Sequence, residues 1–139
     1  MRLHPVTHYG LFTSLAGAYL QAAEQSETIG RAAWLKKAGR ACRAGMKLRK
    51  AFHPGKPEAL RLQGRYEWLK GNTVQAQRWW QKSLAEAEAL GMRYELGLTQ
   101  LEIGQRLGEG VYLERAEAIF TELGAELDLA RSRELLKNL

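Results

Sequence analysis

This chain of 139 residues contains one cysteine and three prolines, and it is poor in Val, Ile and Thr. Because Cys42 is the only cysteine, no disulfide can form within the chain, which favours a reducing, cytoplasmic setting. The shortage of β-branched residues leaves few segments that would form strands. Ala, Leu, Glu, Arg, Lys and Gln dominate instead, and these are strong helix formers. The composition therefore predicts an all-α protein.

Long apolar runs are also missing. No stretch approaches the roughly 20 apolar residues that a membrane span needs, so we expect no membrane insertion. Residues 1–23 loosely resemble a secretory signal, with an apolar stretch over 10–20 followed by two alanines. Thr13 and Ser14 interrupt that stretch, and we therefore expect the chain to stay in the cytoplasm.

Motifs for cofactor chemistry are absent as well. The sequence contains neither GxxxxGK[ST] nor a GxGxxG that follows a strand, so no nucleotide site is predicted. His4 and His8 lie four residues apart but lack a third ligand, which makes a poor metal site. Cys42 is adjacent to Arg43, and it is either an activated thiol or a small buried apolar residue; we favour the second. With no Ser/His/Asp set either, we expect no catalysis, no metal and no cofactor.

Acidic residues are missing between Glu27 and Glu58, although nine Lys or Arg residues occur over 31–56. The helix predicted over 31–52 has two opposed faces. Its basic residues recur at the same helical spacing as its apolar residues, but two positions later in the sequence. Because two positions correspond to about 200° around a helix, the basic residues lie opposite the apolar ones. The apolar face comprises Trp34, Ala38, Ala41, Gly45, Leu48 and Phe52. The basic face comprises Lys36, Arg40, Arg43, Lys47 and Lys50. This basic face is a solvated surface or a site for an acidic protein, nucleic acid or a membrane.

Helical periodicity predicts about seven helices in all. The others lie over 7–24, 57–70, 73–90, 93–107 and 112–123, and a last one ends at Lys137. Their connections are short, so neighbouring helices should be antiparallel. The expected buried stripe over 7–24 is Leu11, Leu15, Ala18, Tyr19 and Ala22, beside a seam of small residues at Gly10, Ser14 and Gly17. Over 93–107 the expected stripe is Tyr94, Leu98, Leu101 and Ile103.

Two stretches repeat each other at a spacing of 40 residues. The first contains Gly64, Ala76, Trp80 and Ala87, and these return as Gly104, Ala116, Phe120 and Leu127. A fixed period of this size is typical of stacked helical hairpins, which usually bind other molecules and do not catalyse. The sequence thus predicts one helical-repeat domain over 1–139, with a helix pair at 1–56, hairpins at 57–91 and 92–124, and a capping helix at 125–139.

These hairpins resemble the tetratricopeptide repeat. In that family a glycine of the first helix is followed, 12 and 16 residues later, by an alanine and a large aromatic residue of the second helix. Gly64, Ala76 and Trp80 match those positions, as do Gly104, Ala116 and Phe120. The chain departs from the pattern at Glu67 and Leu107, where the family has an aromatic residue, and in its period of 40 instead of 34. The resemblance implies a solenoid of hairpins with a groove that binds proteins.

A narrower resemblance covers about residues 59–136. The segments that carry it are Leu69-Lys70-Gly71, Trp79-Trp80, Leu90-Gly91-Met92, Leu101-Glu102-Ile103-Gly104 and Leu123-Gly124-Ala125. They resemble the C-terminal repeat region of large bacterial signalling proteins, in which a nucleotide cyclase or protein kinase domain and an ATPase precede the repeats. The resemblance implies that the chain is a fragment or a relative of the sensor end of such a protein.

The tetratricopeptide resemblance also implies where a ligand would bind, because the first helix of each hairpin lines the groove. Arg61, Arg65 and Trp68 fall on such positions, and Gln105 does so in the second hairpin. Two arginines beside an indole could hold a peptide carboxylate. Alternatively, the arginines form a solvated surface and Trp68 packs on the 7–24 or the 31–52 helix.

Together these features predict a non-catalytic protein-interaction or regulatory module. Its expected partner is a protein or peptide, which the basic face suggests is acidic, and the end hairpins could also self-associate. The alternative is a nucleic-acid-binding helical domain that uses Arg40, Arg43, Lys47 and Lys50. An enzyme is the least favoured function, because no convergent set of titratable residues stands out.

Overall fold

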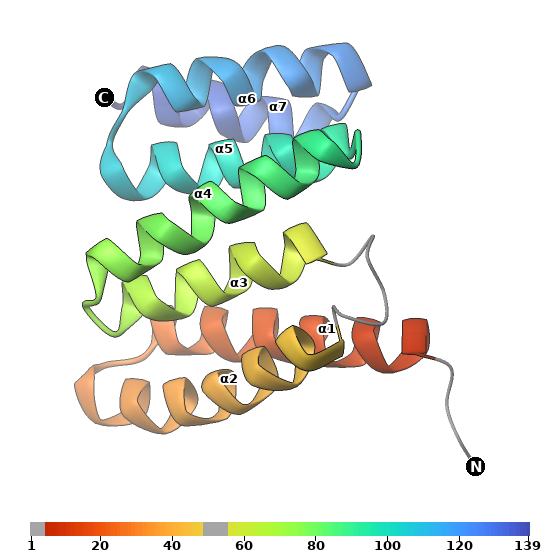
Figure 1. Cartoon of the computed structure of the whole chain (residues 1–139). Coiled ribbons are helices and arrows are strands. Elements are labelled where there is room, and N and C mark those ends of the chain that lie inside the picture. The colour runs from red at the N-terminus through yellow and green to blue at the C-terminus, as the bar shows by residue number, and fades with distance from the viewer. Residues whose placement is uncertain (1–4, 49–55) are drawn as a thin grey trace. The chain divides into compact units, whose positions relative to one another are not determined.

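The structure is a computed structural model that describes residues 5–48 and 56–139, and the side chains from Gly10 onward. It contains seven helices in these ranges and no strand, which confirms the all-α prediction (Figure 1). The helices are α1 (Pro5–Gln25), α2 (Thr28–Leu48), α3 (Lys56–Leu69), α4 (Thr73–Ala89), α5 (Arg93–Leu107), α6 (Gly110–Leu123) and α7 (Glu126–Lys137). Apart from the C-terminal end of α2, which adjoins residues outside the described ranges, the predicted ends differ from these bounds by no more than three residues. His4, Lys50 and Phe52 lie outside the described residues.

The chain divides into two compact units, Met1–Ser83 and Leu84–Leu139, which we call unit 1 and unit 2. The boundary falls inside α4, between Ser83 and Leu84. Unit 1 therefore holds α1, α2, α3 and most of α4, and unit 2 holds the end of α4 with α5, α6 and α7. Each unit is described by itself below.

The core of unit 1 forms where α1 packs against both α2 and α3. It comprises Ala16, Leu20, Ala38, Ala41, Cys42 and Leu62, with Leu15 and Tyr19 packed against its edge. The stripe predicted for α1 was wrong by about one residue, since Leu11 is 53% exposed while Ala16, Leu20 and Ala23 are buried. A helix that contacts two neighbours buries the face between them, and one residue rotates that face by about 100°.

The predicted small-residue seam on α1 was also wrong. A Cβ atom added at Gly10 or Gly17 would meet none of the described residues within 4 Å, and Ser14 is exposed. Helix α2 approaches α3 closely at Gly39, where an added Cβ would lie 2.7 Å from the Tyr66 hydroxyl of α3. A glycine of α2 therefore permits close packing in unit 1, whereas Gly10 and Gly17 of α1 do not contribute to it.

Helices α3 and α4 pack through a fully buried tryptophan. Trp80 lies against Gly64, where any added Cβ would overlap its indole ring. One turn further along α4, the buried Ser83 hydroxyl donates a hydrogen bond of 2.8 Å to the Pro57 carbonyl of α3. Gly71 ends this hairpin's first helix with a φ of 88°, a left-handed conformation that glycine adopts without steric cost.

In unit 2 the corresponding glycines pair differently. Gly104 lies against Leu113, 2.6 Å from an added Cβ, and Phe120 lies against Gly97 at 2.7 Å. Residues that face each other across an antiparallel hairpin lie at similar numbers of residues from its turn. Gly104 is only four residues before the α5–α6 turn at Gly108. Gly64 lies seven residues before Gly71. The 40-residue repeat of the sequence is therefore not matched by the packing inside the two hairpins.

The buried face of α5 also differs from the predicted stripe. Ile103 is buried as expected, but Leu96, Thr99 and Gln100 are buried with it, while Tyr94 is exposed. The Tyr94 hydroxyl donates a 2.8 Å hydrogen bond to Asp128 of α7. Because α5 contacts α7 as well as α6, its inward face is rotated away from the stripe that its leucines suggested.

Candidate interaction surfaces

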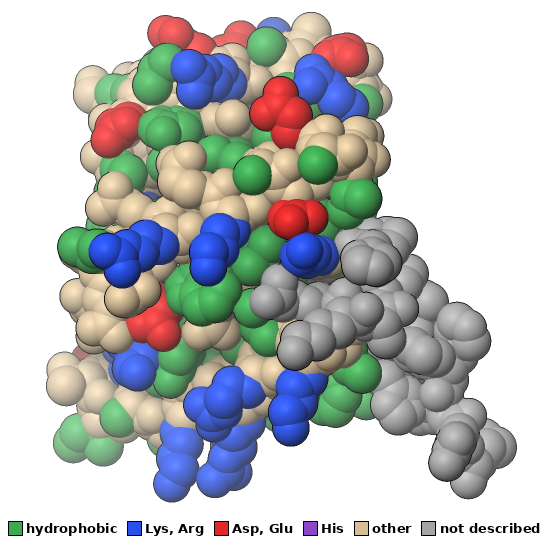
Figure 2. Space-filling view, in the orientation of Figure 1, with side chains coloured by type: hydrophobic (Ala, Val, Ile, Leu, Met, Phe, Trp, Pro, Cys, Tyr) green, Lys and Arg blue, Asp and Glu red, His purple; other side chains and the backbone are tan. Residues whose placement is uncertain are grey.

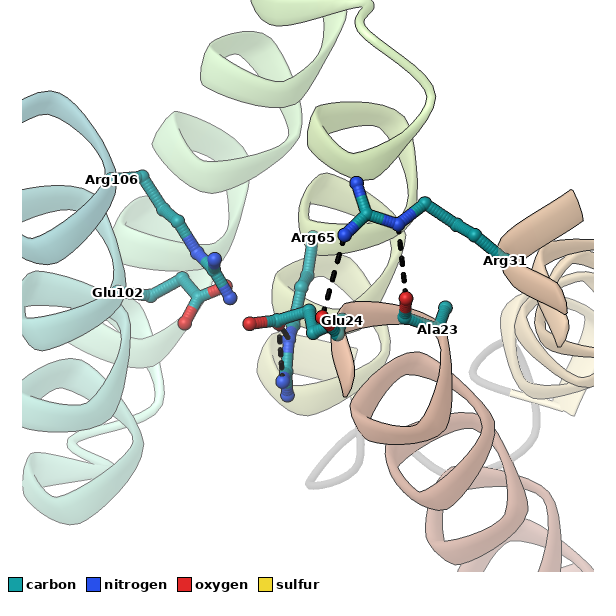
Figure 3. Close-up of polar contacts among 6 residues, drawn as sticks. All are labelled: Ala23, Glu24, Arg31, Arg65, Glu102 and Arg106. Carbon is teal, nitrogen blue, oxygen red and sulfur yellow. Dashed lines mark hydrogen bonds and ion pairs between the residues drawn. The ribbon is translucent and has the colours of Figure 1, made fainter. Parts of the chain in front are cut away.

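The arginine predicted to read a ligand, Arg65, is engaged within unit 1. Its Nε donates a 2.7 Å hydrogen bond to the Glu24 Oε1 of α1, and the two side chains are only 21% and 26% exposed (Figure 3). Arg31 of α2 approaches the same end of α1, where its Nε donates to the Ala23 carbonyl at 3.0 Å. Cations near the last carbonyls of a helix are electrostatically favourable. Arg65 and Arg31 therefore link α3 and α2, respectively, to the C-terminal end of α1.

The other predicted groove residues are half-buried, as Arg65 is. Trp68 is half-buried, and its ring centroid lies 5.8 Å from that of Trp80 in the same hairpin. Arg61 is half-buried on α3. Gln105 is half-buried on α5 in unit 2, where the neighbouring Glu102 and Arg106 form an ion pair at 3.4 Å across one helical turn (Figure 3).

The basic face of α2 is exposed as its spacing predicted. Its described members are Lys36, Arg40, Arg43 and Lys47. None of them forms an ion pair among the residues that the structure describes. Lys50, the fifth predicted member, is outside those residues. Lys and Arg side chains gather over the α2 part of unit 1 in Figure 2.

The charge of the chain is divided unevenly between the two units. By sequence, unit 1 contains 15 Lys or Arg residues and four acids, a net +11, whereas unit 2 contains six and 11, a net −5. Several acids of unit 1 are engaged within the unit: Glu24 pairs with Arg65, Glu67 accepts hydrogen bonds from Asn72 and Gln63, and Glu58 also has a partner. The overall +6 thus hides a strongly basic unit whose α2 cations have little internal compensation.

A cleft of about 350 Å³ lies beside the basic face, between α2, α3 and α4. It is lined mostly by apolar atoms of Arg43, Met46, Lys47, Gln63 and Trp79, and we call it the Trp79 groove. Trp79 was not among the site residues that the sequence predicted. The signal for exposure was the tandem Trp79-Trp80, because consecutive residues of a helix point about 100° apart and Trp80 occupies the hairpin core.

A second cleft lies on the other side of α2. It is about 350 Å³ in volume and is lined by Phe12, Leu15, Tyr19, Lys37, Arg40 and Ala41. The ring of Tyr19 stacks on Trp34 with centroids 6.0 Å apart, and the Lys37 ammonium lies 4.9 Å above the Trp34 ring. The cations of α2 therefore run between two apolar clefts.

Cys42 is the small buried residue that the sequence favoured. Its thiol donates a long hydrogen bond of 3.9 Å to the Leu62 carbonyl. Burial raises the pKa of Cys42 to about 12, which outweighs the opposite effect of Arg43. The thiol is thus neutral at physiological pH and is a poor nucleophile.

Three further findings bear on function. Among the described residues, no group of three or more His, Cys, Asp or Glu side chains is arranged to hold a metal ion. None of the helices in the described ranges has the length and apolar character needed to cross a membrane. No protein-family model, curated protein or solved structure matches this chain.

Proposed function

We propose that the chain is a non-catalytic protein-interaction module that binds an acidic protein segment on the basic face of α2. The observation that carries this proposal is the row of four exposed cations with no ion pair in the described ranges, on a unit of net charge +11. Cations without internal partners create a positive potential that attracts and orients an acidic surface.

The proposal includes the finer architecture that the sequence suggested, a tetratricopeptide-like solenoid of stacked hairpins. Support comes from the glycine-to-aromatic packing of Gly64 on Trp80 and from the glycine turns that end α3, α4, α5 and α6. The sequence resemblance extends the proposal to a cytoplasmic bacterial signalling protein, in which this chain would serve as a regulatory docking region.

Nucleic acid is the second candidate, because the same four cations could neutralise phosphates. Each cation of the row follows the previous one by three or four residues, so they share one helix face. The apolar Trp79 groove beside the basic face favours protein, since a phosphate backbone offers it no apolar group to bury. The two candidates are therefore distinguished by whether the basic face binds an acidic peptide or a nucleic acid more tightly.

The test uses fluorescence anisotropy with the whole chain. One probe is a short fluorescein-labelled peptide in which Leu and Phe at helical spacing are separated by Asp and Glu. The others are labelled single- and double-stranded DNA of similar net charge. We expect the peptide to bind more tightly, and the double variant Lys36→Glu/Arg40→Glu to weaken its binding by roughly tenfold, within the range for close charge pairs.

A matched control reverses two cations of α7, in Arg131→Glu/Arg133→Glu, which equals the first variant in total charge. This control should leave peptide binding within about twofold, since it removes no cation of the basic face. Tighter binding of DNA, with an affinity that falls steeply with salt, would establish the second candidate instead. Peptide binding that both double variants weaken equally would contradict a site on α2.

A further inference from the structure

The Trp79 groove combines an apolar floor with cations on both sides of its tryptophan. Arg43 and Lys47 line the groove from α2, one turn apart, so that they flank Met46. On α4, Arg78 and Lys82 are also one turn apart and line the adjoining outer surface together with Trp79. The Lys82 ammonium lies 4.8 Å from the Trp79 ring, within range of a cation–π contact. Figure 2 shows apolar side chains between Lys and Arg side chains on this face.

The groove leaves apolar surface of Trp79 and Met46 open while placing four exposed cations around it. None of the four forms an ion pair in the part of the chain that the structure describes. The nearby carboxylate of Glu67 is held by Asn72 and by Gln63, which itself lines the groove. The surface is therefore complementary to a large apolar group flanked by carboxylates.

We propose that the Trp79 groove is the specificity pocket of this module, and that it takes a large apolar side chain of an acidic amphipathic segment. This inference rests on the proposed function, since the same segment would reach the basic face of α2. The apolar side chain packs on Trp79 and Met46, and acidic residues one turn before and after it pair with the cations of α2 and α4. Such an aromatic anchor with a charged rim is the usual composition of an interface hot spot.

The apolar side chain in the groove would provide specificity, which the cations alone do not. Cations on a helix face attract any acidic chain, so they raise the association rate but discriminate little. An apolar pocket discriminates, because a segment with Asp and Glu but no Leu or Phe would leave Trp79 in water. The module should thus bind acidic segments only where they carry a bulky apolar residue at helical spacing.

The first experiment compares peptide affinities by the same anisotropy assay. Trp79→Ala should weaken binding of the Leu/Phe-containing acidic peptide by roughly 10- to 30-fold, the range for truncating an aromatic hot spot. The same acidic peptide with Ala in place of Leu and Phe should bind weakly to the native chain, and Trp79→Ala should not weaken it further. Phe12→Ala, which truncates an aromatic side chain in the second cleft, is the matched control and should change affinity by less than about twofold.

The second experiment reports position directly, and its binding measurement is made on the chain without any substitution in the groove. The four tryptophans are replaced by 5-fluorotryptophan, and the fluorine resonance of Trp79 is assigned from the variant Trp79→Phe. Addition of the peptide should shift the Trp79 resonance and leave that of the buried Trp80 in place. A shift at Trp34 alone would locate the peptide at the second cleft and overturn the proposal, because Trp34 stacks on Tyr19 there.

The outcomes separate the pocket from the function on which it rests. If Lys36→Glu/Arg40→Glu weakens the peptide while Trp79→Ala does not, the acidic partner stands and the pocket is wrong. If the peptide does not bind the native chain even at low salt, the proposed function fails as well. Thermal denaturation followed by circular dichroism must show that each variant is folded at the assay temperature.

Discussion

Gly64 of α3 lies directly against the buried indole of Trp80. Because Gly64 has no side chain, it leaves room for Trp80, the largest side chain of the α3–α4 core. Gly64→Ala would place a methyl group inside the volume of the indole ring. We expect a loss of about 1–3 kcal/mol in the free energy of unfolding, the usual cost of overpacking a well-filled core. Chemical denaturation followed by circular dichroism measures this loss.

Gly17 of α1 provides the opposite case within the same unit. It is also an interior helical glycine, but an added Cβ would meet none of the described residues within 4 Å. Gly17→Ala should therefore raise the free energy of unfolding by up to about 1 kcal/mol, because alanine loses less backbone entropy in a helix. If Gly64→Ala raises the denaturation midpoint as Gly17→Ala is expected to do, the close contact at Trp80 is wrong.

The hairpin of α5 and α6 can be tested by pairwise coupling. Gly97→Ala should be destabilising because the added methyl group meets Phe120, and Phe120→Leu should recover part of the loss by freeing space. Gly104→Ala meets Leu113 instead, so Phe120→Leu should not relieve it. A double-mutant cycle for each pair gives the coupling energy. Coupling of Phe120 to Gly104 alone would restore the equivalence of the two hairpins that the sequence repeat suggests.

Arg65 should act on stability more than on ligand binding. Its pair with Glu24 joins α3 to α1 and is about three-quarters buried, so we expect a coupling energy of about 1 kcal/mol between Arg65→Ala and Glu24→Ala. The pair Arg93–Glu122 is also close, at 2.7 Å, but is about half exposed, and its coupling should stay below about 0.5 kcal/mol. Equal couplings would mean that burial does not strengthen the Arg65 pair.

The helix bounds were predictable because glycine and proline mark them in the sequence. Gly71, Gly91, Gly108 and Gly124 all have positive φ at the ends of helices, and Pro57 lies in the first turn of α3. The buried faces were less predictable where a helix packs against two neighbours. On α1 the buried Ala16 and Ala23 are weak hydrophobic signals, whereas the more apolar Leu11 is exposed.

The residues of the candidate site also differ in how far the sequence predicts their positions. The exposure of Lys36, Arg40, Arg43 and Lys47 follows from spacing along one helix, so the sequence contained it. The Trp79 groove requires Met46, Gln63 and Trp79 from three helices to lie together, and no periodicity within one helix reveals that. Arg65 looked like a ligand contact for the same reason: its partner, Glu24, is 41 residues away in the chain.

Cys42 gives a prediction about pH. Its pKa is raised from an ordinary value of 9.0 to about 12 by burial, so the folded state keeps the thiol proton at a pH where the unfolded chain releases it. The stability that the neutral thiol contributes is therefore complete below about pH 9 and is lost as the pH rises toward 12, by up to about 1.4 kcal/mol per pH unit. Comparison with Cys42→Ala isolates this effect, because the two proteins differ only at this residue. The free energy of unfolding of the native chain should fall more steeply with alkaline pH than that of Cys42→Ala, and the native thiol should react with a disulfide reagent far more slowly than in denaturant. Parallel pH curves, together with a fast native reaction, would mean that the thiol is open to water.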